Sequence, residues 1–385
     1  MHFVLIFTFN TMKKNIYLVI IAVVCSLLTI GCSHSFKYTI FGEMPMNEFE
    51  GHTVYLTCID NGEIIDSTVI EKGSFKFKGE AEKTMMGSLR TFDEASNIQA
   101  TSIIVIEKGK IHINMKTDSL YGTPMNELFY KTYTADSVSI MLRNRLEACT
   151  QKYFKADSKQ RQFLMEEYDR LAEEYTSHTI DLSRQIYSQN TDNVLGAYAL
   201  NMIVESDCLT YDSLNAILKN AAPAIADYEP LRKANTRLFH IATTAEGKRY
   251  TDFEGISFTN GKTIRLSTLI DTNKVTLVDF WASWCSPCRK EISDNLVRLY
   301  KKYGNKGLNI IGVDVWDKIP SHKDAVSQLG ITYPQIIDTT RTATELYGID
   351  GVPQIILLDR NGVILHRDLR GNDIETAVLE ALKMN

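Results

Sequence analysis

Residues 277–288 read Leu-Val-Asp-Phe-Trp-Ala-Ser-Trp-Cys-Ser-Pro-Cys, and they carry the strongest structural signal in the chain. Their first half continues an apolar run that begins at Val275 and is typical of a buried strand. Cys285 and Cys288 follow at once, with Pro287 between them at a position that suits the first turn of a helix. The stretch therefore predicts a strand that passes directly into a helix, with two cysteines at the start of the helix.

A cysteine pair with this spacing at a helix N-terminus is suited to redox chemistry. The two sulfur atoms lie within disulfide reach, and the unbonded amides of the first turn face the first sulfur. Because these amides and the helix dipole stabilise a thiolate, we expect the pKa of Cys285 to fall from about 8.5 toward 7, which corresponds to roughly 2 kcal/mol. Cys285 is thus predicted to attack a disulfide, and Cys288 to resolve the mixed disulfide.

Half of a zinc site and an inert structural disulfide are the alternatives for this pair. A structural zinc site needs four ligands, and the chain has neither a second C-x-x-C nor a closely spaced Cys/His pair. The first histidine after Cys288 is His322, 34 residues further on (322 − 288). The strand–turn–helix context also favours a redox motif over a structural disulfide. No metal or other cofactor is predicted besides the redox-active disulfide itself.

The region around the motif, residues 250–385, alternates strand and helix patterns. Strands are predicted at 275–280, 308–315, 333–337, 354–358 and 363–369, and helices at 287–303, 321–329, 342–347 and 374–383. Strands that alternate with helices and end in an antiparallel pair predict an α/β sheet with mixed strand directions.

Two segments of this region resemble the thioredoxin superfamily. Residues 277–288 are similar to the thioredoxin active-site strand and loop, and Tyr347-Gly-Ile-Asp-Gly-Val-Pro353 resembles the segment that carries the family's cis-proline. The insertion at 317–341, together with Arg289-Lys-Glu291, resembles the TlpA/ResA branch of exported thiol–disulfide oxidoreductases. The resemblance covers about the last 130 residues and implies a thioredoxin-like domain over 250–385.

The resemblance also implies roles for individual residues. Pro353 is expected to be cis and to face the cysteine pair, while the Val352 backbone pairs with a client chain as an added strand. Asp279 matches the buried carboxylate that moves a proton when Cys288 attacks, and Glu291 matches an acidic residue near the disulfide. The alternatives are a polar strand-end residue for Asp279 and a solvated helix charge for Glu291.

Trp284 and Pro287 are expected to belong to the client-binding surface.

This sequence departs from the family at three positions. The strand at 308–315 contains no lysine, so the buried carboxylate is expected to lack the cationic partner found in thioredoxin. Gln354 and Ser293 stand where threonine and proline are commoner, which bears on client contacts and on the geometry of the helix.

Residues 1–31 are predicted to be a signal peptide of the lipoprotein type. Lys13 and Lys14 precede an uncharged run at 16–30, which as a helix spans about 22 Å, short of the ~30 Å hydrocarbon core of a bilayer. The small residue before Cys32 resembles a bacterial lipobox, which implies acylation of Cys32 and a lipid anchor. A plain signal peptide that is cut elsewhere is the alternative. In either case we expect the protein in the cell envelope, facing the periplasm.

Residues 36–122 are predicted to form an antiparallel β-sandwich-like domain. Short alternating segments are separated by turns that contain glycine or asparagine. Asp66-Ser67 and Gly73-Ser-Phe-Lys-Phe-Lys-Gly79 resemble an uncharacterised β-domain that precedes thioredoxin modules in envelope lipoproteins.

Residues 123–245 are predicted to form a helical region between the β-domain and the C-terminal domain. Ser158 is the expected cap of a helix whose apolar stripe runs from Leu164 to Leu182. Such a stripe is typical of core packing.

Composition excludes several classes of protein. The chain has 385 residues, 42 Lys+Arg and 47 Asp+Glu, a net charge of −5 and 44% hydrophobic residues, as in an ordinary globular protein of two or three domains. The absence of a Lys/Arg block argues against nucleic acid as a partner.

Cys58, Cys149 and Cys208 are isolated in the sequence. We expect them to be small buried residues, and a regulatory disulfide is the alternative.

Taken together, these features predict a lipid-anchored thiol–disulfide oxidoreductase of the envelope. By family analogy, it reduces disulfides of client proteins, draws electrons from a membrane thiol reductant and serves cytochrome c maturation. Peroxidase chemistry is disfavoured, because a C-x-x-C stands where a lone Thr-x-x-Cys nucleophile is expected. The alternative is a binding lipoprotein for a protein or glycan, in which the thioredoxin-like module is a redox sensor or scaffold.

Overall fold

The structure is a computed structural model of the chain, and it describes residues 35–44, 49–93, 98–206 and 208–383. The predicted signal peptide and Cys32 lie outside the described residues. The chain divides into two compact units, with the break between Ile186 and Tyr187. Among the described helices, none combines the length and the apolar character needed to cross a membrane.

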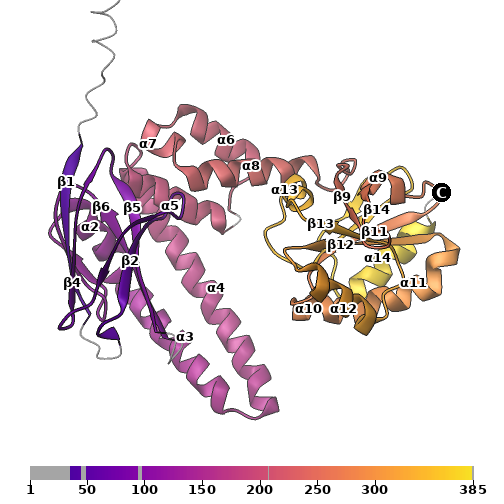
Figure 1. Cartoon of the computed structure of the whole chain (residues 1–385), viewed down its shortest axis with the longest axis horizontal. Helices are drawn as coiled ribbons and strands as arrows, with labels where there is room; N and C mark the ends of the chain where they lie inside the picture. Colours follow the sequence, from indigo (N-terminus) through magenta and orange to yellow (C-terminus); the bar gives the residue numbers. More distant parts are fainter. Residues whose placement is uncertain (1–34, 45–48, 94–97, 207, 384–385) are drawn as a thin grey trace, which may run out of the picture. The chain divides into compact units, whose positions relative to one another are not determined.

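The N-terminal unit begins with a β-rich domain of two four-stranded sheets, with the strand orders β4-β1-β7-β8 and β3-β2-β5-β6 (Figure 1). The strands alternate between buried and exposed side chains; in β4, for example, Phe75 and Phe77 are buried while Ser74 and Lys76 are exposed. The bounds are β1 (Phe36–Glu43), β2 (Thr53–Cys58), β3 (Ile64–Val69), β4 (Ser74–Ala81), β5 (Met85–Asp93), β6 (Ile98–Ile106), β7 (Gly109–Asn114) and β8 (Ser119–Tyr121).

Helices follow the β-rich domain, and the break between the two units falls near the C-terminal end of the last of them. They are α2 (Pro124–Phe129), the π-helical turn η2 (Tyr130–Thr134), α3 (Ser137–Lys155) and α4 (Ser158–Gln189). The predicted cap at Ser158 is wrong by one residue, because Asp157 Oδ1 accepts the N–H groups of Lys159 and Gln160 at 3.0 and 2.9 Å. Leu171 of the predicted stripe packs in a small buried cluster with the α3 side chains of Leu142 and Cys149.

Four further helices open the second unit. They are α5 (Val194–Glu205), α6 (Tyr211–Asn220), α7 (Pro223–Ala226) and α8 (Glu229–Thr243). Their starts follow ordinary capping rules: Asn193 caps α5 with its side-chain oxygen, Thr210 caps α6, and a proline stands in the first turn of α7 and α8.

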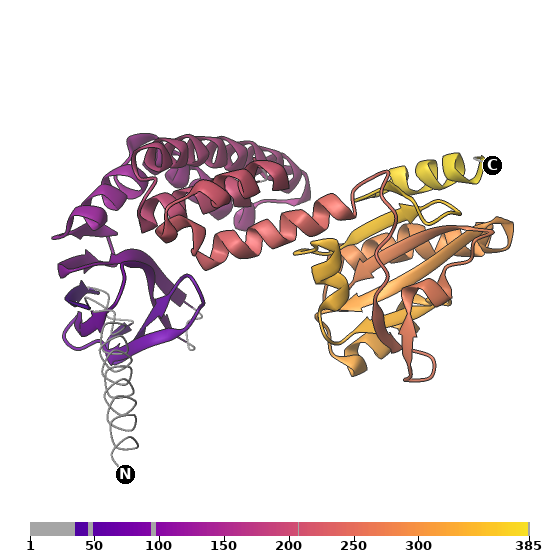
Figure 2. The ribbon, with the colours of Figure 1, turned by 90° about the horizontal axis from the view of Figure 1, so that it is seen from above.

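The C-terminal domain is built around one seven-stranded sheet with the order β10-β9-β13-β12-β11-β14-β15 (Figure 2). The central strand β11 pairs in parallel with β12 and antiparallel with β14, as the alternation of strand and helix patterns predicted. The bounds are β9 (Glu254–Ser257), β10 (Thr263–Arg265), β11 (Val275–Trp281), β12 (Leu308–Val315), β13 (Gln335–Asp338), β14 (Gln354–Leu358) and β15 (Ile364–His366).

Every residue of β11 and β12 is buried, because apolar clusters lie on both faces of the sheet. The helices and helical turns are α9 (Leu266–Leu269), α10 (Ser286–Glu291), η3 (Ile292–Leu296), α11 (Val297–Tyr303), η4 (Gly304–Lys306), α12 (Ile319–Leu329), α13 (Thr342–Tyr347) and α14 (Asn372–Lys383). Ser293, the departure from the commoner proline, lies in the π-helical turn η3. The predicted succession of a β-domain, a helical region and a thioredoxin-like α/β domain is confirmed. The prediction of a wholly antiparallel β-domain is wrong, because β1 pairs in parallel with β7.

Candidate active site

The cysteine pair lies where strand β11 passes into helix α10. Cys285 and Cys288 are joined by a disulfide, with 5.3 Å between their Cα atoms. Cys285 is the N-terminal cap of α10, and the Cys288 backbone N–H donates to its Sγ at 3.1 Å. This donor would stabilise negative charge on Sγ after reduction, because the first amides of a helix have no partner within the helix.

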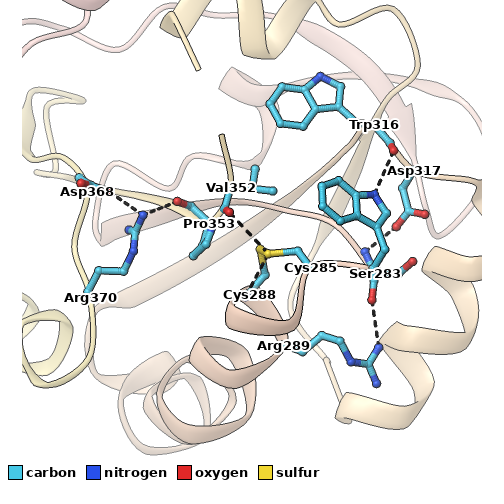
Figure 3. The surroundings of a disulfide bond; sticks show 11 residues. Ser283, Cys285, Cys288, Arg289, Trp316, Asp317, Val352, Pro353, Asp368 and Arg370 are labelled. Atoms are coloured by element: carbon cyan, nitrogen blue, oxygen red, sulfur yellow. Dashed lines mark hydrogen bonds and ion pairs between the residues drawn. A yellow bond between two sulfur atoms is a disulfide. The ribbon is translucent and has the colours of Figure 1, made fainter. Parts of the chain in front are cut away.

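The opposing wall of the site comes from the loop before β14. The Val352–Pro353 peptide bond is cis, and the Val352 carbonyl oxygen lies 3.6 Å from Cys285 Sγ (Figure 3). The loop therefore places the Val352 carbonyl directly against the sulfur that is predicted to attack. This is the juxtaposition that the resemblance implied, while the client-binding roles of the two residues stay predictions.

A second loop, between β12 and α12, holds the active-site turn from its other side (Figure 3). The Ser283 N–H donates to Asp317 Oδ2 at 2.6 Å, and the Trp284 indole N–H donates to the Trp316 carbonyl at 3.2 Å. Trp284 is nevertheless 61% exposed, so one large apolar surface stands beside a disulfide that is itself buried. An exposed tryptophan in this position suits contact with another polypeptide.

Asp279 is the buried carboxylate of the site. It lies on β11, is 1% exposed, and its Oδ2 has no hydrogen-bond partner among the described residues. The pKa of Asp279 is raised to about 8, mainly because the carboxyl is buried. The positive charge of Arg370 opposes this rise, and the negative charge of Glu291 adds to it. A carboxyl with a pKa near neutrality can both hold and release a proton at physiological pH.

Strand β12 carries no lysine beside this carboxylate, as expected, but a cation from another element still acts on its pKa. The cation comes from Arg370, just before α14, and not from strand β12 where the family places a lysine. Arg370 donates to the carbonyl of Pro353 and pairs with Asp368 at 2.5 Å (Figure 3). One guanidinium therefore holds the cis-proline loop and acts electrostatically on Asp279. The sequence carried no local signal for this role, because Arg370 lies 91 residues after Asp279 (370 − 279).

Glu291 is held in place by backbone, so the alternative of a freely solvated charge is not supported. Its two carboxylate oxygens accept the Gly371 N–H at 3.1 and 3.2 Å, and Asn295 Nδ2 donates to Oε2 at 2.8 Å. Glu291 thus binds the residue next to Arg370 in the loop before α14, and the two charges have opposite effects on the pKa of Asp279.

The other cysteines within the described residues are of two kinds, buried and exposed. Cys58 and Cys149 are free and buried, in keeping with their prediction as small core residues. Cys208 is free and exposed, so the prediction of burial is wrong for it. Cys208 lies in the connection between α5 and α6, two residues before Thr210, the cap of α6.

Removing the charges of Arg370 and Glu291 should move the pKa of Asp279 in opposite directions. We expect Arg370→Met to raise it and Glu291→Gln to lower it, because the guanidinium favours the carboxylate and the glutamate opposes it. NMR titration of the Asp279 carboxyl carbon in the oxidised protein measures both shifts. Arg289→Met is the matched control, since Arg289 contacts Ser283 and Gln328 instead. Shifts of the same sign in the first two variants would contradict the electrostatic assignment.

Family models match two parts of the chain. Residues 247–367 match the AhpC/TSA family, and residues 38–129 match a domain of unknown function, DUF4369. A buried cysteine pair at a helix start, faced by a cis-proline on a mixed sheet, defines a thioredoxin-like domain.

Curated relatives narrow this class. The thiol-disulfide oxidoreductase ResA of Bacillus thuringiensis subsp. konkukian (strain 97-27) is 31% identical over 123 residues, which are 32% of this chain and 69% of the relative. ResA of Bacillus thuringiensis (strain Al Hakam) is 34% identical over 107 residues, 28% of this chain and 60% of the relative. The chain belongs, through its C-terminal domain, to the ResA-like thiol-disulfide oxidoreductases of the thioredoxin superfamily.

A solved structure is similar over the same domain. The thioredoxin domain of a thiol-disulfide oxidoreductase from Bacteroides vulgatus is 32% identical, with a TM-score of 0.34, and the match covers 36% of this chain and 99% of that one.

The matches to the ResA proteins are partial. This chain spans about 60% of the length of the first curated relatives it matches.

Proposed function

We propose that this protein is a thiol–disulfide oxidoreductase of the cell envelope that reduces disulfides in client proteins. The observation that carries the proposal is the Cys285–Cys288 disulfide at the start of α10, with the Cys288 N–H donating to Cys285 Sγ beside the Val352 carbonyl. The pair combines a stabilised attacking sulfur, a resolving sulfur within bonding distance and a backbone edge for a client.

Reduction of a client proceeds in two exchanges. In the reduced protein, the Cys285 thiolate attacks one sulfur of the client disulfide, a mixed disulfide forms, and the other client sulfur leaves as a thiolate that takes up a proton. Cys288 then loses its proton and attacks Cys285 Sγ, which releases the second client thiolate and re-forms the Cys285–Cys288 disulfide. Two electrons pass to the client in each cycle.

Asp279 is the proposed acceptor of the Cys288 proton. Its raised pKa, about 8, places the carboxyl close to the pH at which a proton must be exchanged with a thiol. Its burial on β11 keeps this exchange away from bulk solvent. Glu291 and Arg370 set the charge around it.

The client is proposed to bind as an extended segment along the cis-proline loop. Val352 would supply the backbone groups for strand addition, and Pro353 would shape the loop. The exposed indole of Trp284 and the exposed Pro287 would contact the client on the motif side. Backbone pairing suits an enzyme with several clients, because it places few demands on client side chains.

The setting of the reaction is proposed from the N-terminal sequence. A lipid on Cys32 would tether the protein to a membrane, facing the periplasm, and a membrane thiol reductant would return electrons to the Cys285–Cys288 disulfide. The Ser-Pro dipeptide between the cysteines favours the reducing direction. Apocytochrome c before haem attachment is the client class that family analogy suggests.

The Cys288→Ser variant should accumulate clients as mixed disulfides on Cys285, because the resolving thiol is missing. We expect bands of higher mass on non-reducing gels of cell extracts that collapse with dithiothreitol, and mass spectrometry would identify the partners. The Cys285→Ser/Cys288→Ser double variant is the control and should trap nothing. If the single variant traps no more protein than the double variant, the proposed reduction of client proteins is wrong.

A further inference from the structure

Three metal-ligating side chains meet beside the active-site turn, apart from the cysteine pair. Asp314 lies in β12, Asp317 follows this strand, and His322 lies in the first half of α12. Each offers one ligand atom, and these atoms lie within 4.8 Å of one another. The end of a buried parallel strand and a packed helix thus bring one imidazole and two carboxylates to one point.

The inner two members of this cluster are buried and incompletely paired. Asp314 is 1% exposed and His322 is 0% exposed, with 3.1 Å between Asp314 Oδ1 and His322 Nδ1. Neither carboxylate oxygen of Asp314 and neither ring nitrogen of His322 is satisfied by a hydrogen bond of good geometry among the described residues, and this includes Asp314 Oδ1 and His322 Nδ1, which face each other in the cluster. Buried polar atoms are nearly always satisfied, and an ion or a water is the usual explanation for those that are not.

The surroundings of His322 are apolar on its other sides. Its ring packs against the Trp281 ring at 5.0 Å and the Phe258 ring at 5.2 Å, centroid to centroid. The carboxylates of Asp314 and Asp317 offer oxygen atoms within 4.8 Å of each other. Two carboxylates held close together in an apolar surrounding repel each other, and a bound cation removes this repulsion.

We propose that Asp314, Asp317 and His322 bind a divalent transition-metal ion next to the active-site turn. One imidazole nitrogen and two carboxylate oxygens suit zinc, manganese or iron better than magnesium or calcium, which prefer oxygen ligands alone. Three protein ligands leave a position open for water. The bond lengths of such ions, about 2.0–2.2 Å, require the ligand atoms to close to roughly 3.4 Å, and the partly exposed Asp317 can move to achieve this.

Binding of the ion would also reach the active-site turn. Asp317 Oδ2 accepts the Ser283 N–H at 2.6 Å, and Asp317 Oδ1 accepts the Lys318 N–H at 2.7 Å. A cation on this carboxylate therefore sits one hydrogen bond away from the residue that precedes Trp284.

Zinc titration of the full protein tests the proposal. The Cys285–Cys288 disulfide is kept oxidised so that the pair offers no thiolate, and Zn²⁺ is partitioned between the protein and a chromophoric chelator. We expect one equivalent to be bound by the wild type, and affinity to fall at least about tenfold in His322→Leu and in Asp317→Asn, since even residues that only support metal ligands contribute 10- to 100-fold. Bound Zn²⁺ should also raise the thermal midpoint of the wild type.

Matched controls separate ligand loss from misfolding. His366→Ala removes a 42%-exposed histidine of the same domain and should leave zinc affinity unchanged. Asp317→Asn keeps an oxygen that can accept the Ser283 N–H, so this variant should fold. Its zinc affinity therefore tests the site even if His322→Leu does not fold. The proposal is overturned if the wild type binds no more Zn²⁺ than Asp317→Asn does. It is also overturned if excess Mg²⁺ displaces the bound Zn²⁺. In either case Asp314 and His322 are only a buried ion pair.

Discussion

Cys285→Ser should abolish the reduction of a model disulfide substrate by this protein. With dithiothreitol as electron source, we expect the rate to fall to that of dithiothreitol alone. A serine hydroxyl stays protonated at neutral pH and cannot form the mixed disulfide that begins the cycle. Because the Cys288 N–H bonds to the side chain at this position, serine can keep the helix cap, and the fold should be retained.

Cys208→Ser is the matched control for this experiment. Cys208 is the exposed free cysteine of the described chain, so its loss removes one accessible thiol without touching the motif. The rate of Cys208→Ser should equal that of the wild type. If Cys285→Ser reduces the substrate at the wild-type rate, the proposed enzyme activity is wrong. If Cys208→Ser loses the activity, the reactive thiol is Cys208 and not Cys285.

Asp279→Asn should make the C-terminal domain more stable at high pH. Between the ordinary pKa of 3.8 and the folded value of about 8, the folded protein keeps a proton that the unfolded chain has released. The free energy of unfolding of the wild type therefore falls as pH rises through this window. Asparagine has no proton to lose, so the advantage of the variant should grow from pH 4 to pH 8 and then level off.

The difference in the free energy of unfolding at pH 9 has an upper limit of about 6 kcal/mol, because the pKa rises from 3.8 to about 8 and each pKa unit corresponds to about 1.36 kcal/mol. Tryptophan fluorescence during urea unfolding is the measurement, since the three tryptophans of the chain, Trp281, Trp284 and Trp316, all lie in this domain. The oxidised protein is used so that Cys285 and Cys288 do not titrate. Parallel stability curves for the two proteins between pH 5 and 9 would contradict the raised pKa.

Local sequence patterns predicted long, strongly patterned elements best. The buried strand at β11, the helix after the cysteines and β12 were predicted within one or two residues, because each has an unbroken apolar or periodic pattern. The short strands β9 and β10 were missed, since three or four residues carry too little pattern. Strand β7, which begins at Gly109, pairs in parallel with β1, a long-range contact for which the sequence has no local signal.

The candidate site shows the same division. Sequence alone determined that two cysteines stand at the start of a helix and directly after a buried strand, because spacing and helix geometry are local properties. Only the tertiary structure brought Arg370 and Glu291 to the buried Asp279, and placed Asp314 against His322. These groups come from separate strands, loops and helices, and their meeting depends on how the sheet and its covering helices pack.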